Sequence, residues 1–205
     1  MTSTLHLALI DTLADWEIGF LTAHLTHGGG DVRVATVSLD GGPVTTMGGL
    51  RVAADLALAD LRPEDSAMLV LPGGETWESG DGDGFVDAAR ALLGAGVPVA
   101  AICGAVWALA VGGLLDDRRH TGNDPGWLAA SGYGGAALYV DAPAVSDRGV
   151  VTATAVAPAH FAAEVFRTLG SHPEPMVDSW LKLYGDRDPA GFHELMAMAG
   201  TEQRA

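Results

Sequence analysis

Short apolar runs, separated by glycine, proline and polar residues, recur along this chain. Four of them have the length and composition of buried strands in a parallel sheet: residues 5–10, 32–38, 68–71 and 97–102. Longer stretches with helical character lie between and after them: residues 16–28, 85–93, 105–115, 125–131, 158–169, 176–184 and 190–199. This alternation predicts a single doubly wound α/β domain over residues 1–205, with a parallel sheet covered by helices on both faces.

Several shorter elements complete this pattern. Residues 44–47 and 50–52 read as a hairpin closed at Gly48-Gly49, and residues 56–61 as a short helical piece. Two late strands, residues 144–145 and 150–154, are expected to pair with each other. No internal repeat or linker interrupts the series.

The stretch around the only cysteine joins a strand directly to a helix. Residues 97–102 run without a spacer into Cys103-Gly104, and residues 105–115 are apolar on nearly every side. A strand that turns sharply into a helix places the turn at the carboxyl edge of the sheet, where open α/β folds have their sites. A helix N-terminus favours a thiolate and lowers the pKa of a thiol. Cys103 is therefore the predicted functional centre; the alternative is a small buried apolar residue.

Composition narrows the classes of function. The chain has 205 residues and a formal net charge of −15, without a basic run, which argues against nucleic acid and anionic membranes as partners. One cysteine excludes an internal disulfide. The N-terminal residues lack a basic region before an apolar one, and no apolar run reaches membrane-spanning length. We therefore expect a cytoplasmic protein.

The sequence predicts neither a metal site nor a cofactor. His24 and His27 lie three residues apart on a predicted helix, but no cysteine or acidic ligand accompanies them, so surface positions are expected. The glycines include no phosphate-binding loop followed by Lys-Ser or Lys-Thr, so nucleotide use is not expected.

Three segments together resemble the ThiJ/PfpI family, part of the class I glutamine-amidotransferase-like superfamily. They are Asp-Trp-Glu at residues 15–17, Leu-Pro-Gly-Gly at 71–74 and Ala-Ile-Cys-Gly-Ala at 101–105. Residues 113–121 and 151–158 also look like the family, so the resemblance spans about residues 5 to 170. It implies a flavodoxin-like fold and a homodimer, for which the apolar C-terminal helices offer a surface.

The resemblance also implies roles for individual residues. Cys103 matches the nucleophile and Glu17 the carboxylic acid that touches its sulfur, an arrangement that works best when Glu17 is protonated. Gly74 and Gly104 match the pair whose N–H groups form an oxyanion pocket. The alternative for Glu17 is an acidic residue that complements the dipole of its helix. The alternative for Gly74 and Gly104 is that they are ordinary turn glycines.

The identity of a general base stays open at this point. Many relatives carry histidine directly after the nucleophile, but this chain has Gly104, which weakens an assignment as a protease. His120 is the best candidate, because it follows the buried helix near the sheet edge, with a structural histidine as the alternative. His160 and His172 compete with it. His172 begins a His-Pro-Glu match to glutamine amidotransferases, which we interpret as accidental because a whole helix separates it from the last strand.

Glu75 and Trp77, with Glu78, follow the Gly-Gly turn and are expected to line the pocket mouth; a solvated loop is the alternative.

The resemblance implies a thiol-dependent enzyme acting on a small carbonyl, amide or related electrophile by hydrolysis, hydration, deglycation or glyoxalase-like chemistry. The main alternative is a redox-sensing or stress-response protein that uses oxidation of Cys103 without turnover. A third is a metabolite-binding pocket without turnover.

Overall fold

The computed structural model describes residues 3–27 and 32–202, and its centre is a seven-stranded sheet of order β5-β2-β1-β6-β7-β9-β8. The strands are β1 (Ser3–Leu9), β2 (Val32–Ser38), β5 (Leu56–Ala57), β6 (Met68–Leu71), β7 (Val99–Ile102), β8 (Ala144–Asp147) and β9 (Val150–Ala153). Six strands run parallel, and β8 pairs antiparallel with β9 at one edge. The predicted flavodoxin-like α/β fold is confirmed, with β8 as an antiparallel addition.

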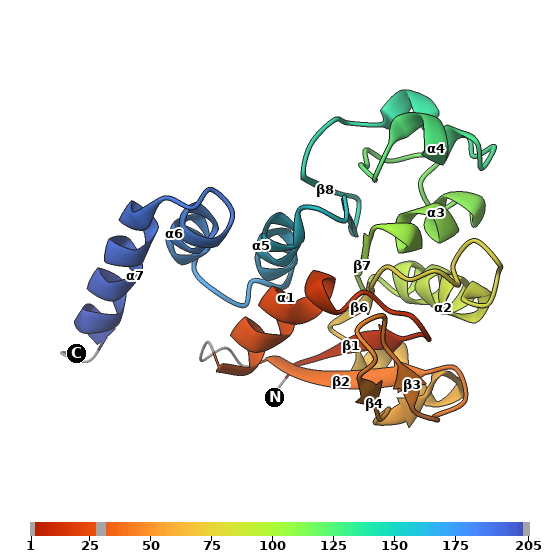
Figure 1. Cartoon of the computed structure of the whole chain (residues 1–205), viewed down its shortest axis with the longest axis horizontal. Coiled ribbons are helices and arrows are strands. Elements are labelled where there is room, and N and C mark those ends of the chain that lie inside the picture. The colour runs from red at the N-terminus through yellow and green to blue at the C-terminus, as the bar shows by residue number, and fades with distance from the viewer. Residues whose placement is uncertain (1–2, 28–31, 203–205) are drawn as a thin grey trace.

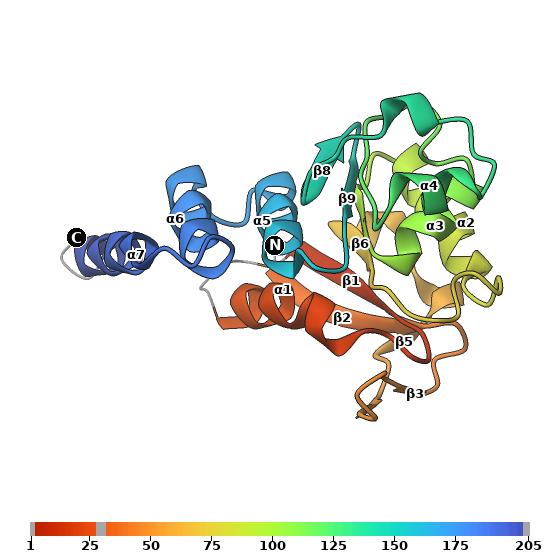
Figure 2. The ribbon, with the colours of Figure 1, turned by 45° about the horizontal axis from the view of Figure 1, so that its top comes forward.

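Helices cover both faces of this sheet (Figures 1 and 2). They are α1 (Asp15–His27), α2 (Asp83–Gly94), α3 (Gly104–Val111), α4 (Pro125–Ala129), α5 (Pro158–Leu169), α6 (Glu174–Tyr184) and α7 (Pro189–Glu202). One face carries α1 and α5, and the other carries α2 and α3. Beyond α5, α6 and then α7 stack outward, away from the sheet (Figure 2). Within the described residues, no helix is long and apolar enough to cross a membrane.

The central strands are apolar throughout because both of their faces are buried. In β6, Leu69 and Leu71 pack into the core under α2 and α3, while Met68 and Val70 pack into the core under α1 and α5. All four side chains have no exposed surface. Because successive side chains of a strand point to opposite faces of the sheet, one strand thus contributes side chains to both cores.

A small hairpin, β3 (Val44–Thr45) and β4 (Arg51–Val52), lies over the loop between β1 and α1. The Thr12 N–H donates to the Thr45 carbonyl at 2.8 Å, and the Gly48 N–H donates to the Asp15 carboxylate at 2.7 Å. The order of the sheet reverses next to β1, so the loops that follow β1 and β6 diverge there and leave room at the carboxyl edge.

Two predicted elements differ from the structure. Residues 56–61 were expected to be helical, but Leu56 pairs with Val37 to form the edge strand β5 before a 3₁₀ turn, Leu58–Asp60. The buried helix stops at Val111 instead of residue 115, and Gly113 has a positive φ of 69°, which a continuing helix does not allow. The predicted glycine end of the first helix lies outside the described residues.

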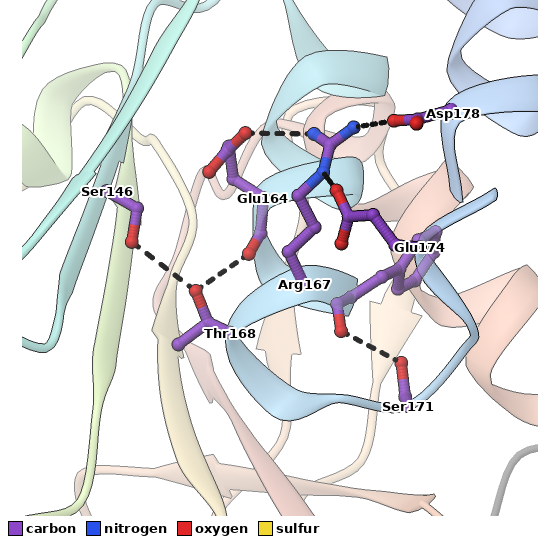
Figure 3. A network of polar contacts seen from close by, with 8 residues as sticks. Ser146, Glu164, Arg167, Thr168, Ser171, Glu174 and Asp178 are labelled. Atoms are coloured by element: carbon purple, nitrogen blue, oxygen red, sulfur yellow. Dashed lines mark hydrogen bonds and ion pairs between the residues drawn. The ribbon is translucent and has the colours of Figure 1, made fainter. Parts of the chain in front are cut away.

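A polar network joins α5 to α6 (Figure 3). The Arg167 guanidinium forms ion pairs with Glu164 at 2.9 Å, Glu174 at 2.6 Å and Asp178 at 2.6 Å. Three carboxylates from two helices therefore converge on one partly buried cation. The outermost helix is held to α6 by Lys182 and Glu194, at 2.6 Å.

Candidate functional site

Cys103 sits at the turn between β7 and α3, in a backbone conformation that is unusual for a side-chain-bearing residue. Its φ is 60° and its ψ is −125°. The Cys103 N–H donates to the Ala153 carbonyl at 3.1 Å, and the Cys103 carbonyl accepts from the Val106 N–H at 3.1 Å. These bonds hold a strained turn in place, which aims the thiol away from the strand at the carboxyl edge of the sheet.

Glu17, in the first turn of α1, is the acidic group beside this thiol. Its side chain is fully buried, and Oε2 accepts a hydrogen bond from the Gly73 N–H at 2.6 Å. The other oxygen, Oε1, is buried without a hydrogen-bond partner among the described residues. Burial raises the pKa of Glu17, and the Gly73 N–H and the nearby Cys103 side chain offset this only in part.

Gly73 explains how Glu17 and Cys103 come so close together. A methyl group on Gly73 would lie 2.6 Å from Glu17 Oε2 and 2.7 Å from Cys103 Cβ, both shorter than real contacts allow. Only glycine fits between them. The structure therefore brings together three of the segments that the sequence singled out: the start of α1, the turn after β6 and the turn after β7.

The electrostatics of the thiol differ from the sequence-based expectation. Burial raises the pKa of Cys103 to about 11; a hydrogen bond from Asn123 lowers it, and the nearby Glu17 carboxylate raises it further. Desolvation is thus the largest influence on the pKa of Cys103, and the hydrogen bond from the Gly104 N–H at the start of α3, which lowers the pKa, is the smallest. Since each group shifts the pKa of the other, Cys103 and Glu17 titrate as a pair.

Asn123 is a site residue that the sequence interpretation missed. Its Nδ2 donates to Cys103 Sγ at 3.3 Å, while its Oδ1 accepts from the Ala155 N–H at 2.9 Å. Because the backbone donor fixes the carbonyl end of the amide, the N–H₂ end faces the sulfur. An N–H donor in this position stabilises negative charge on sulfur. No motif marks Asn123; its position three residues after His120 is the only signal.

His120, the expected general base, is fully buried and bonded elsewhere. Its Nδ1 lies 2.9 Å from the Arg118 carbonyl, and its Nε2 lies 2.7 Å from the Tyr133 hydroxyl. Its main chain pairs with Leu138 and Val140. Both ring nitrogens therefore have partners other than the thiol, and the role of His120 as general base stays a prediction.

The two competing histidines lie at opposite edges of the sheet. His172 follows the C-terminal end of α5, which places it at the amino edge, where it lines a small apolar cavity with His24 and Trp180. Its neighbour Glu174 is bound by Arg167. His160 lies in the first turn of α5 at the carboxyl edge, and it lines the same groove as Asn123.

The two glycines expected to form an oxyanion pocket lie against each other. A methyl group on Gly104 would be 3.0 Å from the Gly74 carbonyl oxygen and 3.7 Å from the Gly74 nitrogen. Their backbones thus meet next to Cys103, and their role as oxyanion donors stays a prediction.

Glu75 and Trp77 were expected to line the pocket mouth. Glu75 is exposed, and its N–H donates to the Thr12 hydroxyl at 2.9 Å. Trp77 is only 3% exposed, donates from Nε1 to the Pro72 carbonyl at 2.8 Å and packs against Phe85. The expectation for Trp77 is corrected: its apolar ring is part of the core and packs under the Pro72-Gly73-Gly74 turn.

An open groove of about 560 Å³ lies at the carboxyl edge, and Cys103 itself is not among its lining residues. Its walls are residues 121–125, residues 139 and 141–143, and the turn from β9 into α5, including His160. Asn123 belongs to the groove and also contacts Cys103 Sγ, so it connects the two.

A second hollow of similar volume lies around His6 and Arg33, at the amino edge of the sheet. Among the described residues, no group of three or more His, Cys, Asp or Glu side chains is arranged to hold a metal ion.

The fold and the site together define a class of proteins. In this class, a parallel α/β sheet carries a cysteine on a strained strand-to-helix turn of the nucleophile-elbow type, with a buried glutamate beside it. Residues 4–168 match the model of the DJ-1/PfpI family, and the chain belongs to that family. It is 35% identical to Uncharacterized protease YoaZ of Bacillus subtilis, over 95% of this chain and 97% of that protein. It is 32% identical to Deglycase PfpI of Pyrococcus furiosus, over 52% of this chain and 64% of that protein.

Solved structures agree with this membership. The thiJ/pfpI family protein from Bacillus anthracis superposes with a TM-score of 0.88 at 36% identity, covering 96% of this chain and 98% of that one. The DJ-1 superfamily protein Atu0886 from Agrobacterium tumefaciens superposes with a TM-score of 0.79 at 38% identity, covering 90% and 98%. The family predicted from the three sequence segments is confirmed.

Proposed function

We propose that this protein is a cysteine-dependent enzyme in which Cys103 Sγ attacks the carbon of a small carbonyl, amide or related electrophile. The observation that carries the proposal is the position of the sulfur, on a strained turn between a buried carboxyl group and an amide donor. Relatives named as a protease and a deglycase support an enzymatic role in the family.

Glu17 is the proton carrier in this proposal. Oε2 already accepts from Gly73, so a proton on Glu17 resides on Oε1, the oxygen without a partner. A protonated Glu17 no longer raises the pKa of Cys103 and donates to the thiolate instead. When the sulfur–carbon bond forms, the electron pair of the C=O bond moves to oxygen, and that oxygen takes the proton from Oε1. Backbone N–H groups at Gly104 and Gly74 stabilise the oxygen before it is protonated.

We propose a positioning role for His120 in place of the general-base role predicted from the sequence, because both of its ring nitrogens are bonded away from the thiol. Its ring and main chain fix residues 118–121 against residues 133–140, and Asn123 follows directly. We propose that this arrangement presents the Asn123 amide to the sulfur. An imidazole in contact with Cys103 is then unnecessary, because the amide stabilises the thiolate and Glu17 moves the proton.

Redox sensing is the second candidate function, and one observation favours it. Cys103 is the only cysteine in the chain and is partly exposed, so an oxidised sulfur has no internal thiol with which to form a disulfide. A sulfenic or sulfinic acid would then persist, and a protonated Glu17 Oε1 is placed to hydrogen-bond its oxygen.

Turnover by the wild-type protein and by Cys103→Ala distinguishes the two functions. We expect saturable turnover of at least one member of a panel of small dicarbonyls, amides and isonitriles, and its complete loss in Cys103→Ala. Mass spectrometry after mild peroxide treatment measures oxidation in parallel. Selective oxidation of Cys103 without turnover of any panel member would favour the sensor. Turnover that survives in Cys103→Ala would refute both.

We also propose a cytoplasmic homodimer, as the family resemblance implies. The exposed apolar side chains of Phe192 and Met196 on α7 provide a surface for association. Sedimentation of the wild type and of Phe192→Glu tests this proposal: a dimer that the substitution dissociates supports it, and a wild-type monomer contradicts it.

A further inference from the structure

The groove beside Cys103 is lined by carboxylates and lacks strongly basic side chains. Of its lining residues, the ionisable acids are Asp124 and Asp141, together with Tyr139, and the only basic one is the imidazole of His160. No lysine or arginine lines it. A ligand with a positive charge is therefore attracted into this groove, and a ligand with a negative charge is repelled.

The two carboxylates differ in their freedom to bind a ligand. Asp124 Oδ1 accepts from the Trp127 N–H at 2.7 Å and caps α4, so its position is fixed by the fold. Asp141 is exposed, and its carboxylate forms no hydrogen bond or ion pair with any residue that the structure describes. Asp141 is thus the carboxylate available to a bound cation.

Several other polar groups of the groove wall are already used, whereas the imidazole of His160 forms no hydrogen bond with any residue that the structure describes. The Tyr139 hydroxyl donates to the Gly122 carbonyl at 3.1 Å, and the Thr121 hydroxyl donates to the Ala142 carbonyl at 2.8 Å. Asn123 uses its oxygen on Ala155 and its nitrogen on Cys103. What the groove still offers to a ligand is the negative charge of Asp141 and the imidazole of His160, and Asn123 connects the groove to the sulfur of Cys103.

We propose that the site selects electrophiles that carry a cationic group, such as an ammonium or guanidinium, and that Asp141 is the residue that determines this specificity. The inference rests on the proposed function in one respect, that Cys103 Sγ is the reacting atom; it does not require turnover. An anionic electrophile of the same size would approach two carboxylates with no basic side chain except His160 to offset them.

A pair of methanethiosulfonate reagents tests this, one with a trimethylammonium group and one with a sulfonate group. The Cys103 thiolate attacks the sulfenyl sulfur, a mixed disulfide forms, and methanesulfinate leaves. Because Cys103 is the only cysteine, whole-protein labelling rates report on this site alone. At 0.15 M salt, and relative to the rates with 2-mercaptoethanol, we expect the cationic reagent to be favoured about tenfold.

Variants separate the groove from the net charge of the chain. Asp141→Asn should lower the rate ratio about three- to fivefold, since an exposed ion pair contributes modestly, and Asp141→Glu should restore it. Asp65→Asn makes the same change in net charge at the amino edge of the sheet and should leave the ratio unchanged.

Three results would overturn the inference. The first is a ratio of cationic to anionic labelling rates equal to that of 2-mercaptoethanol, and the second is an equal effect of Asp141→Asn and Asp65→Asn on this ratio. The third is no labelling by either reagent, since the groove would then give no access to the thiol. Failure of the proposed function looks different, because a protein without turnover can still show the charge preference, and an active enzyme can lack it.

Discussion

Glu17 is fully buried and Cys103 is partly buried beside it, and in the proposed mechanism the two acids share one proton. Glu17 Oε2 is satisfied by the Gly73 N–H, but Oε1 has no partner among the described residues, so ionising Glu17 leaves a charged oxygen unsolvated. Ionising Cys103 next to an already ionised Glu17 is opposed by burial and by like charge. The arrangement with one negative charge on sulfur and the proton on Oε1 avoids the ionised carboxylate and the like charge, so that burial of the sulfur is the cost that remains.

The direction of a pKa change tests this arrangement. Glu17→Leu removes the acidic donor, so the midpoint of Cys103 alkylation by iodoacetamide should rise by about one to two pH units, the equivalent of one hydrogen bond to a charged group. Glu17→Gln keeps an N–H donor and should remain within about one unit of the wild type. If Glu17 is instead ionised beside the thiol, Glu17→Leu will lower the midpoint, and the shared-proton arrangement is wrong.

At the scale of residues, the sequence was informative where local geometry determines the role. Cys103 was identifiable because strand, cysteine and glycine are contiguous, and Glu17 because a matching segment follows the first strand. Asn123 was not, since its role depends on how a loop folds onto the end of β9, 32 residues further along the chain at Ala155. The burial of Trp77 escaped prediction for a similar reason, because its partners are formed by tertiary packing.

At the scale of elements, the joint between α5 and α6 depends on Arg167. Its side chain is 24% exposed and stands between Glu164 on its own helix and Glu174 and Asp178 on the next (Figure 3). Removing the guanidinium would leave three carboxylates close together without a cation, and their like charges would repel the two helices from each other.

Arg167→Met should therefore lower the free energy of unfolding by about 1–3 kcal/mol, more than an exposed pair would. Arg51→Met is the matched control, since Arg51 has no ion pair within the described part of the chain and the net charge changes equally. Urea unfolding of both variants at neutral pH measures the difference. Equal destabilisation would show that the network contributes no more than net charge.

Element prediction succeeded where both faces of a strand or one face of a helix are buried. The strands at residues 32–38 and 68–71 and the helix at residues 158–169 agree with the structure at both ends. The edge strand β5 did not, because two residues carry too little periodicity and only the pairing with β2 makes them a strand. The early end of α3 is due to backbone conformation at Gly112-Gly113, which apolar composition does not reveal.

At the scale of the whole molecule, the buried Glu17 makes stability depend on pH. Its pKa is raised in the folded protein, so above the unfolded value near 4.5 the folded chain keeps a proton that the unfolded chain has released. The free energy of unfolding therefore falls as pH rises through the window between those two pKa values, and this contribution is present in full only below about pH 4.5.

Glu17→Gln removes this titration while keeping the shape of the side chain. We expect the variant to be more stable than the wild type by about 1–3 kcal/mol at pH 7.5, the cost of an unsatisfied buried polar group, and the two proteins to converge near pH 4.5. Urea unfolding across this range measures both curves. A constant difference at all pH values would contradict a raised pKa for Glu17.

The matched family region ends at residue 168, close to the C-terminal end of α5, so α6 and α7 lie beyond it. The Bacillus anthracis structure nevertheless covers 96% of this chain, which includes most of these two helices. The prediction of a single domain across residues 1–205 stays a prediction.

The positive φ of Cys103 has a consequence for how such a site is inherited. Glycine is the residue best suited to this backbone conformation, so a mutation from cysteine to glycine would relax the turn while removing the sulfur. A descendant that lost its chemistry would then fold at least as well as its ancestor. Selection for folding alone would therefore not preserve a cysteine at this position.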